Sequence, residues 1–167
     1  KYGKVIINDI SAGELDPLIV DVAAEHDVPY VAMHMKGDPR TMQSMTDYRD
    51  IVAEVVDYFR ERTAQLRERG VRRIVVDPGF GFAKTLEQNY ELLRGLHRLA
   101  ELGYPVLAGV SRKSMIYKLL GTTPAEALNG TTALHWECLR QGAVILRAHD
   151  TREAVEVVRM FDQFMQA

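Results

Sequence analysis

The stretch RIVVDPGFGFAKTLEQNYELL, residues 73–93, carries the signals that decide the fold. It begins as a β-branched apolar run that ends on a carboxylate, Asp77, and continues into a loop with two glycines and two phenylalanines. The Thr-Leu-Glu-Gln sequence from Thr85 matches a capping box, and apolar residues recur at helical spacing from Leu86 onward. The stretch is therefore predicted to be one strand–loop–helix unit.

The same alternation of strand and helix patterns runs through the chain. Apolar runs typical of parallel strands buried on both faces occur at Lys4–Asn8, Pro29–Met35, Arg73–Asp77, Pro105–Gly109 and Ala143–Arg147. Helical patterns fill the gaps between them. Further helix starts are predicted at Asp16-Pro17 and at a second capping box from Thr123, and Gly70 is predicted to end a long helix that begins near Ile51. Apolar residues from Ala154 onward mark a last helix.

Alternating strands and helices predict a parallel α/β fold. Two architectures fit this pattern, an open doubly wound sheet and a (β/α)₈ TIM barrel. A barrel takes ~250 residues, or roughly 31 per unit, so a chain of this length supplies about five units. Five strands cannot close an eight-stranded barrel. We therefore expect either an open sheet or an incomplete barrel, in which residues 1–167 are the C-terminal part of one domain and the N-terminal βα units are absent.

Composition excludes several classes of function. The chain has 167 residues, 47% of them apolar, and a net charge of −2, so no general attraction to nucleic acid or to acidic membranes is expected. No apolar run is long enough to span a bilayer, and no signal peptide is recognisable. The lone Cys138 excludes an internal disulfide and fits a reducing cytoplasm. Because the chain opens without Met and enters a strand-like run at once, we expect it to be part of a longer protein.

Polar residues follow the predicted strands, at the point where each strand ends. The five clusters are Asn8-Asp9, Met33–Lys36, Asp77, Ser111–Ser114 and Arg147–Asp150. Both candidate architectures bind ligands at the C-terminal ends of their strands. The five clusters are therefore expected to share one site, although they lie far apart in the sequence.

Three of these clusters suggest specific chemistry. Arg147 and His149 are two residues apart and suit a phosphate-type anion, although a surface arginine and a capping histidine are an equally good interpretation. Asp77 can accept two N–H donors from a planar ring with a guanidine-like edge, or else cap the turn before Pro78, and Asn8 could read the same ring or serve a turn. Lys113, taken alone, is more often a solvated lysine than a donor to a ligand.

Other residues of the clusters have weaker signals. Met33 and Phe82 are by default core residues, but beside polar ring-binding groups they could line a flat slot. His34 has no second metal-ligating residue at suitable spacing, so a buried and hydrogen-bonded histidine is expected rather than a metal ligand. The loop GFGFAK has Lys84 where a dinucleotide motif requires its third glycine, so it is a weak signal for phosphate binding.

Taken together, these motifs resemble the dihydropteroate synthases, a family of pterin-binding enzymes. The matching blocks follow the family's order and cover essentially the whole chain: Ile7–Ile10, Met33–Met42, Asp77–Lys84, Gly109–Ser114 and Leu146–Asp150. The resemblance implies a TIM barrel of which this chain supplies the fourth to eighth βα units. It also implies that the parent protein is a cytoplasmic, homodimeric transferase of folate biosynthesis. Such an enzyme joins 4-aminobenzoate to 6-hydroxymethyl-7,8-dihydropterin pyrophosphate and releases pyrophosphate.

The resemblance further implies the residues that bind the pterin. Asn8 and Asp77 would hydrogen-bond its edge, Met33 and Gly109 would line its slot, and Lys113 would contact the ring while flanking the aminobenzoate.

The remaining substrate groups are assigned in the same way. Arg147 and His149 would hold the leaving pyrophosphate, and Phe82, Lys113 and Ser114 would lie near the aminobenzoate. The implied catalytic residues are Lys113, Arg147 and His149 together with Asp77. We expect the protein to act by positioning and leaving-group stabilisation, without a covalent enzyme intermediate.

The resemblance also implies features that this chain does not carry. The family's first three units supply an asparagine associated with Mg²⁺, a further pterin-binding aspartate and two mobile loops, so no metal ligand is expected in residues 1–167. We expect these residues alone to have two exposed sheet edges and no useful turnover.

Two alternatives stay open at this point. A methyltetrahydrofolate-binding methyltransferase of the same barrel family would use the aspartate and asparagine similarly but would have no pyrophosphate to hold. A non-catalytic fragment or dimerisation module is the second.

Overall fold

The computed structural model describes residues 3–37 and 45–166. Its five strands are β1 (Ile7–Asp9), β2 (Tyr30–Met33), β3 (Ile74–Asp77), β4 (Leu107–Ala108) and β5 (Ile145–Leu146). Every pairing is parallel: β1, β2 and β3 form one ladder, β4 and β5 form another, and a bridge between Val76 and Val106 joins the two. The strands therefore lie side by side in the order in which they occur in the chain.

This strand order distinguishes the two predicted architectures. An open doubly wound sheet reverses its order at a switch point, whereas consecutive strands of a TIM barrel remain neighbours. The order from β1 to β5 contains no reversal among the described strands. The prediction of a parallel α/β fold is confirmed, and the strand order is that of the barrel type.

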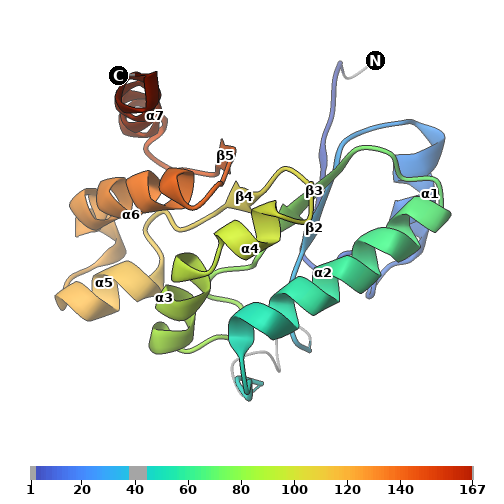
Figure 1. The fold of residues 1–167 in the computed structure, drawn as a ribbon, viewed down its shortest axis with the longest axis horizontal. Coiled ribbons are helices and arrows are strands. Elements are labelled where there is room, and N and C mark those ends of the chain that lie inside the picture. Colours follow the sequence, from blue (N-terminus) through green and yellow to red (C-terminus); the bar gives the residue numbers. More distant parts are fainter. Residues whose placement is uncertain (1–2, 38–44, 167) are drawn as a thin grey trace.

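Helices alternate with the strands and follow one another from α1 at the right of Figure 1 to α7 at the upper left. Their bounds are Leu18–Glu25 (α1), Ile51–Glu68 (α2), Leu86–Arg94 (α3), His97–Ala100 (α4), Ser114–Leu120 (α5), Leu128–Arg140 (α6) and Thr151–Gln166 (α7), with a 3₁₀ turn at Pro124–Glu126. Among the described residues, none of these helices has both the length and the apolar character needed to cross a membrane.

Most of the helix starts and ends predicted from the sequence are confirmed. Thr85 and Gln88 form the predicted capping box at the start of α3, and Gly70 follows the C-cap of α2 with φ +90°. The box from Thr123 instead opens the 3₁₀ turn, so α6 begins only at Leu128. At α1 the N-cap is Pro17 and not Asp16, although the Asp16 carboxylate still accepts a hydrogen bond from the Leu18 backbone.

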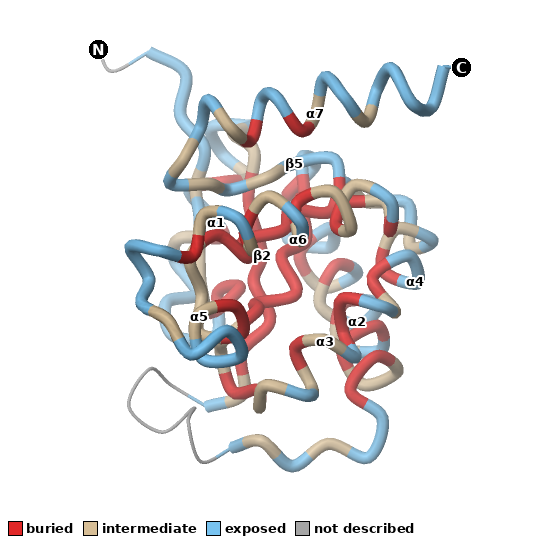
Figure 2. The backbone as a smooth tube through the Cα atoms, turned by 90° about the vertical axis from the view of Figure 1, so that its left-hand side faces the viewer, coloured by how far each residue is buried: buried red, intermediate tan, exposed pale blue. Residues whose placement is uncertain are grey.

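The two faces of the sheet bury different residues. Strand residues such as Tyr30, Val76 and Ala108 join a large core with side chains from the helices, including Phe59 and Leu92. The intervening strand residues form a small separate cluster on the opposite face, namely Val31, Val75 and Leu107. Figure 2 shows the buried segments gathered in the middle of the molecule. The helices therefore cover one face of the sheet and leave the other for the small cluster.

The prediction that every strand is covered on both faces is wrong for the two outer strands. Val5 and Ile6 are 49% and 66% exposed, and β1 begins only at Ile7; Val144, before β5, is 66% exposed. In the described part of the chain β1 and β5 each pair with a strand on one side only. Their apolar side chains thus lack a neighbour on the other side, as edge strands do.

The last helix packs on α6 through aromatic contacts. Trp136 of α6 meets Phe161 and Phe164 of α7 at ring distances of 5.4 and 5.6 Å. Met160 and Met165 on the same helix are 66% and 65% exposed. In Figure 2 α7 runs along the top of the molecule with most of its length exposed.

Candidate functional site

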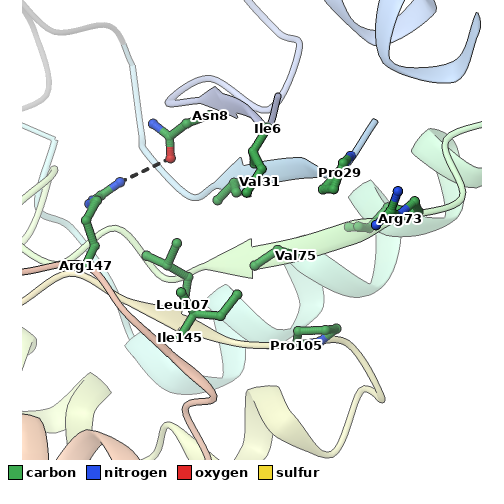
Figure 3. A pocket seen from close by; sticks show the side chains of 11 residues that line it. Ile6, Asn8, Pro29, Val31, Arg73, Val75, Pro105, Leu107, Ile145 and Arg147 are labelled. Atoms are coloured by element: carbon green, nitrogen blue, oxygen red, sulfur yellow. Dashed lines mark hydrogen bonds between the residues drawn. The ribbon is translucent and has the colours of Figure 1, made fainter. Parts of the chain in front are cut away.

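The candidate site lies on the face of the sheet opposite the helices, at the C-terminal ends of the strands. Alternate residues of a strand share a face, and one apolar residue from each strand region lines a groove of about 530 Å³: Ile6, Val31, Val75, Leu107 and Ile145 (Figure 3). Two residues further along each strand stand Asn8, Met33, Asp77, Gly109 and Arg147. These are four of the five predicted pterin-binding residues together with Arg147.

Asp77 is a fully buried carboxylate at the end of β3. Its Oδ1 accepts a hydrogen bond from the Gly79 backbone at 2.8 Å, whereas Oδ2 accepts none from the described residues, although Arg147 Nη2 lies 3.1 Å away. Burial raises the pKa of Asp77, and the Arg147 charge opposes that shift. Because a buried oxygen without a donor is costly, Oδ2 is available to accept a donor from a ligand.

Gly79 explains how the loop after β3 comes so close to β2. It has φ +68°, and a Cβ at this position would collide with the backbone carbonyl of His34. A side chain here would push the loop away from β2 and remove the backbone N–H that holds Asp77. The first glycine of GFGF therefore serves a close backbone approach.

Arg147 follows β5 and reaches across the sheet to both predicted ring-binding residues. Its Nη1 donates to Asn8 Oδ1 at 3.1 Å (Figure 3). Its Nη2 forms the ion pair with Asp77. On its way the guanidinium passes over Gly109, where a Cβ would come 2.7 Å from Nη2. The sequence predicted that Asn8 and Asp77 bind a ring with a guanidine-like edge. In this structure the planar guanidinium of Arg147 contacts both of them.

Lys113 joins the loop after β3 to the loop after β4. Its Nζ donates to the Phe80 carbonyl and lies 4.8 Å from the centre of the Phe82 ring. Burial lowers the pKa of Lys113 to about 8, and the nearby Asp77 charge opposes that shift. Ser114, the next residue, is half-buried and begins α5. Lys113 therefore brings a cation and an aromatic ring together beside Asp77.

His149 is held by a buried hydroxyl from the neighbouring loop. Ser111 Oγ accepts a hydrogen bond from the His149 backbone N–H at 3.1 Å and lies 2.9 Å from Nδ1 of the ring. Since that oxygen already accepts one hydrogen bond, its own proton is free to be donated to Nδ1 of a neutral imidazole. In the tautomer in which Nδ1 accepts this proton, Nε2–H of the exposed His149 ring is a donor that can be directed at an anion.

Arg112 ties the same two loops together. Its guanidinium forms a two-point ion pair with Asp150, at 2.9 Å from Nε to Oδ2 and 2.7 Å from Nη2 to Oδ1. It also donates to the carbonyls of Pro124 and Ala125. The hydrogen bonds from Arg112 lower the pKa of Asp150. Lys113 follows Arg112 in the chain, and His149 precedes Asp150. The ion pair therefore fixes the positions of Lys113 and His149 relative to each other.

Comparison with known proteins agrees with this geometry. Residues 1–149 match the sequence family described as pterin binding enzyme. The chain belongs to the pterin-binding enzyme family. The dihydropteroate synthases of Synechocystis sp. and Escherichia coli are each 42% identical to it, over 96% and 100% of this chain. These alignments cover 56% and 60% of the relatives, so the chain spans less than two thirds of their length.

Solved structures of this family superpose closely. The Thermus thermophilus dihydropteroate synthase in complex with 6HMPPP has a TM-score of 0.91, and its complex with 4-aminobenzoate has 0.92. Both are 40% identical to this chain and cover 96% of it, while the chain covers 64% and 66% of them. A Yersinia pestis dihydropteroate synthase with a sulfonamide drug complex reaches 0.94 at 35% identity, covering 99% of this chain, which covers 60% of that one.

Contacts in this chain link all five predicted clusters. Asn8, Asp77 and Arg147 meet directly. The backbone of His34 donates to the Asp77 carbonyl at 2.9 Å, Lys113 bonds the Phe80 carbonyl, and Ser111 bonds His149. Met33 is buried and pairs with Asp77 in the register of β2 and β3. The ligand roles of these residues stay predictions, and residues 38–42 of the second motif lie outside the described part of the chain.

Three residues that support the site, Asp9, Lys84 and Ser111, were given no supporting role by the sequence, although Asp9 and Ser111 stand in two of the predicted clusters. Asp9 accepts hydrogen bonds from Ser11, from the Gly13 backbone and from Tyr30, and so shapes the loop after β1; its spacing to Ser11 was the available signal. Ser111 and Lys84 are also buried. No local signal identifies a buried lysine, because lysine is usually exposed.

Metal binding finds no support in the described residues. His34 is 3% exposed, with Nδ1 3.1 Å from Lys84 Nζ, so the prediction of a buried, hydrogen-bonded histidine is confirmed. Burial lowers the pKa of His34 well below its usual value. Within residues 3–37 and 45–166 no three histidine, cysteine or carboxylate side chains gather where they could hold a metal ion.

Proposed function

We propose that the protein to which this chain belongs is a dihydropteroate synthase, a transferase that condenses 4-aminobenzoate with 6-hydroxymethyl-7,8-dihydropterin pyrophosphate. The observation that carries the proposal is the buried Asp77, whose Oδ2 accepts no hydrogen bond from the described residues and is paired only with the Arg147 charge. The relatives named as this enzyme, and the structures in complex with 6HMPPP and 4-aminobenzoate, support it.

The pterin edge is proposed to bind where the Arg147 guanidinium now lies. Asp77 accepts from ring N–H groups, and Asn8 completes the hydrogen bonds at the same edge. Met33 and Gly109 belong to the same face of the sheet, so they form the walls of a flat slot. For the pterin to reach these acceptors Arg147 must leave them, which releases its guanidinium for the leaving group.

The pyrophosphate is proposed to bind between Arg147 and His149. Arginine supplies a planar pair of donors that matches phosphate oxygens. His149 adds the Nε2–H donor that its Ser111 contact leaves free. Both residues are exposed, as a site for a highly charged leaving group requires.

The aminobenzoate is proposed to bind beside Phe82, Lys113 and Ser114. The Phe82 ring supplies an apolar wall, while the Lys113 ammonium, 4.8 Å from that ring, can reach both substrates. Ser114, the first residue of α5 and the neighbour of Lys113 in the chain, offers a hydroxyl.

The reaction needs positioning and charge stabilisation more than acid–base chemistry. The C–O bond between the pterin methylene and pyrophosphate breaks, and its electron pair leaves on the pyrophosphate oxygen. The amine lone pair of aminobenzoate then forms the C–N bond, and the nitrogen gives up a proton to solvent. Arg147 and His149 stabilise the growing negative charge, and Asp77 orients the ring. Mass spectrometry of the enzyme quenched during turnover should find no covalent pterin adduct.

We also propose that the five described βα units are the fourth to eighth units of the barrel. The sequential strand order and the edge character of β1 and β5 support this arrangement. Three further units would cover the apolar groove floored by Val31, Val75 and Leu107. Mg²⁺ at the pyrophosphate would then need ligands from those units. Residues 1–167 alone are expected to give no useful turnover.

A homodimer in the cytoplasm is proposed for the whole protein. Met160 and Met165 on α7 expose apolar surface of the kind that subunit interfaces bury. Cys138 is a free, buried thiol, as is common in reducing compartments.

Titration calorimetry of the 167-residue chain tests the proposal. With 6-hydroxymethylpterin and inorganic pyrophosphate as separate ligands, we expect both to bind, the first to be lost in Asp77→Asn and the second in Arg147→Met. Pterin binding without any pyrophosphate binding would instead favour a methyltransferase of the same barrel family. Binding of neither ligand would contradict the placement of the pterin and pyrophosphate sites on these residues and favour a non-catalytic module.

A further inference from the structure

Lys84 is a buried lysine for which the proposed reaction has no use. It is 7% exposed, and its Nζ lies 3.0 Å from the Gly79 carbonyl, 2.8 Å from the Phe82 carbonyl and 3.1 Å from His34 Nδ1. An ammonium carries three N–H donors, so these three acceptors use all of them. Of the ion pairs found among the described residues, none includes Lys84. The side chain is therefore matched to acceptors inside the protein rather than to a counter-ion.

The segment that Lys84 braces is a turn with unusual backbone conformation. Gly79, Gly81 and Ala83 have φ of +68°, +83° and +52°, and Ala83 pays a steric cost for a conformation that favours glycine. One backbone hydrogen bond, from Phe82 N to Gly79 O at 3.0 Å, closes the turn. Lys84 donates to the carbonyls of Gly79 and Phe82, the two residues that this hydrogen bond joins. It therefore stabilises a turn that the backbone alone holds weakly.

This turn carries groups on the substrate side of the site. The Phe82 ring faces Lys113, whose Nζ also donates to the Phe80 carbonyl. Both of these contacts of the Lys113 side chain are therefore with the turn that Lys84 braces. Asp77 is less dependent on it, because β3 pairing and the ion pair with Arg147 also hold that carboxylate.

His34 completes the brace from β2. The ring is buried edge-on against Tyr58, with the ring centres 4.9 Å apart, so the position of Nδ1 is fixed. Burial lowers the pKa of Lys84 to about 7, the Asp77 charge opposes that shift, and Lys113 and Lys36 add to it. A neutral amine keeps two N–H donors for the two carbonyls and can accept from Nδ1–H of the other histidine tautomer. The brace therefore survives a change of protonation.

We propose that Lys84 is a positioning residue for the aminobenzoate side of the site, setting Phe82 and Lys113 through the carbonyls of the 79–82 turn. This role rests on the proposed function. Lys84 would not touch either substrate, yet it would affect the binding of aminobenzoate and not that of the pterin.

The test compares Lys84→Met, which keeps the length and removes all donors, with Lys84→Gln, which restores two. Lys118→Met, an exposed lysine on α5, is the control. Calorimetry measures 6-hydroxymethylpterin and pyrophosphate binding to the 167-residue chain, then 4-aminobenzoate binding in the presence of both. Amide hydrogen exchange at Phe82 reports the turn itself.

The expected result for Lys84→Met is aminobenzoate binding weakened about tenfold or more, with pterin and pyrophosphate affinity changed by less than about threefold. Exchange at the Phe82 amide should rise by about tenfold, and Lys84→Gln should recover part of both effects. Unchanged aminobenzoate affinity would overturn the proposal, and so would an equal loss of all three ligands. If the unsubstituted chain binds no pterin, the proposed function fails first, independently of the variants.

Discussion

Replacing Asp77 by asparagine should separate ligand binding from folding more cleanly than any other single change. The substitution keeps the shape of the side chain and the acceptor for the Gly79 backbone, now 2.8 Å from Oδ1. It removes the charge and can turn the free Oδ2 into an NH₂ group. That group would face the ring N–H donors of the pterin, donor against donor.

The loss of pterin affinity can be worked from these contacts. A hydrogen bond to a charged group contributes about 1.5–3 kcal/mol, and a buried donor left unpaired costs about 1–3 kcal/mol. The lower ends of these ranges together predict a loss of roughly 2.5 kcal/mol, which is about 70-fold in Kd. Pyrophosphate binding should not weaken, because Arg147 loses a competing partner and keeps its own donors.

Asp77→Asn should weaken pterin binding but should not reduce folding stability. Burial raises the pKa of Asp77 above its ordinary 3.8, so the folded state holds this proton more tightly than the unfolded state does. The stability contributed by that proton is complete below about pH 4 and is lost as the pH rises through the folded-state pKa. Above the folded-state pKa the ionised carboxylate is therefore a cost to folding, and Asp77→Asn should leave the melting temperature unchanged or raise it.

Titration calorimetry at pH 7 and differential scanning calorimetry measure the two effects on the same samples. Asp57→Asn, at an exposed position of α2, is the matched control and should change neither quantity. A lower melting temperature together with an equal fall in pterin and pyrophosphate affinity would mean that Asp77 is a structural residue. The assignment of pterin and pyrophosphate to different residues would then be wrong.

Three other parts of the structure, the anion-binding residues, α7 and Lys84, give further predictions. Arg147→Met should weaken pyrophosphate binding by about tenfold or more but leave pterin affinity equal or higher, since the acceptors at Asp77 are vacated; a fall in both by calorimetry would contradict this. Ser111→Ala should weaken pyrophosphate binding by about fivefold by freeing the imidazole it orients, and Ser111→Thr should restore it; an unchanged Kd would exclude the orienting role. Met160→Glu on α7 should shift a dimer of the whole protein toward monomer in sedimentation, and an unchanged mass would argue against that interface. The free energy of unfolding should rise between about pH 7 and pH 9, because the pKa of Lys84 is lowered to about 7 in the folded state and the unfolded lysine still binds its proton there; urea titrations in which Lys84→Met keeps the full slope would exclude this lysine as the cause.

The sequence by itself determined the local features of this protein. Continuous apolar runs located the strands within Pro29–Met35 and Arg73–Asp77, because a strand covered on both faces must be apolar throughout. The capping box at Thr85 was readable because its hydrogen bonds join residues three apart. Polar residues at strand ends were likewise visible, and the shared motifs identified the family.

Only the tertiary structure decided which strands are neighbours and where the long side chains lie. The sequential order of β1 to β5 depends on pairing between segments that are far apart in the chain, so no local pattern contains it. The contact of Arg147 with Asn8 and Asp77 spans up to 139 positions of sequence, and the burial of Lys84 depends on two carbonyls turned inward by positive φ angles. Local periodicity reports whether a residue is buried, whereas the direction of a flexible cation is set by acceptors that only the folded chain brings together.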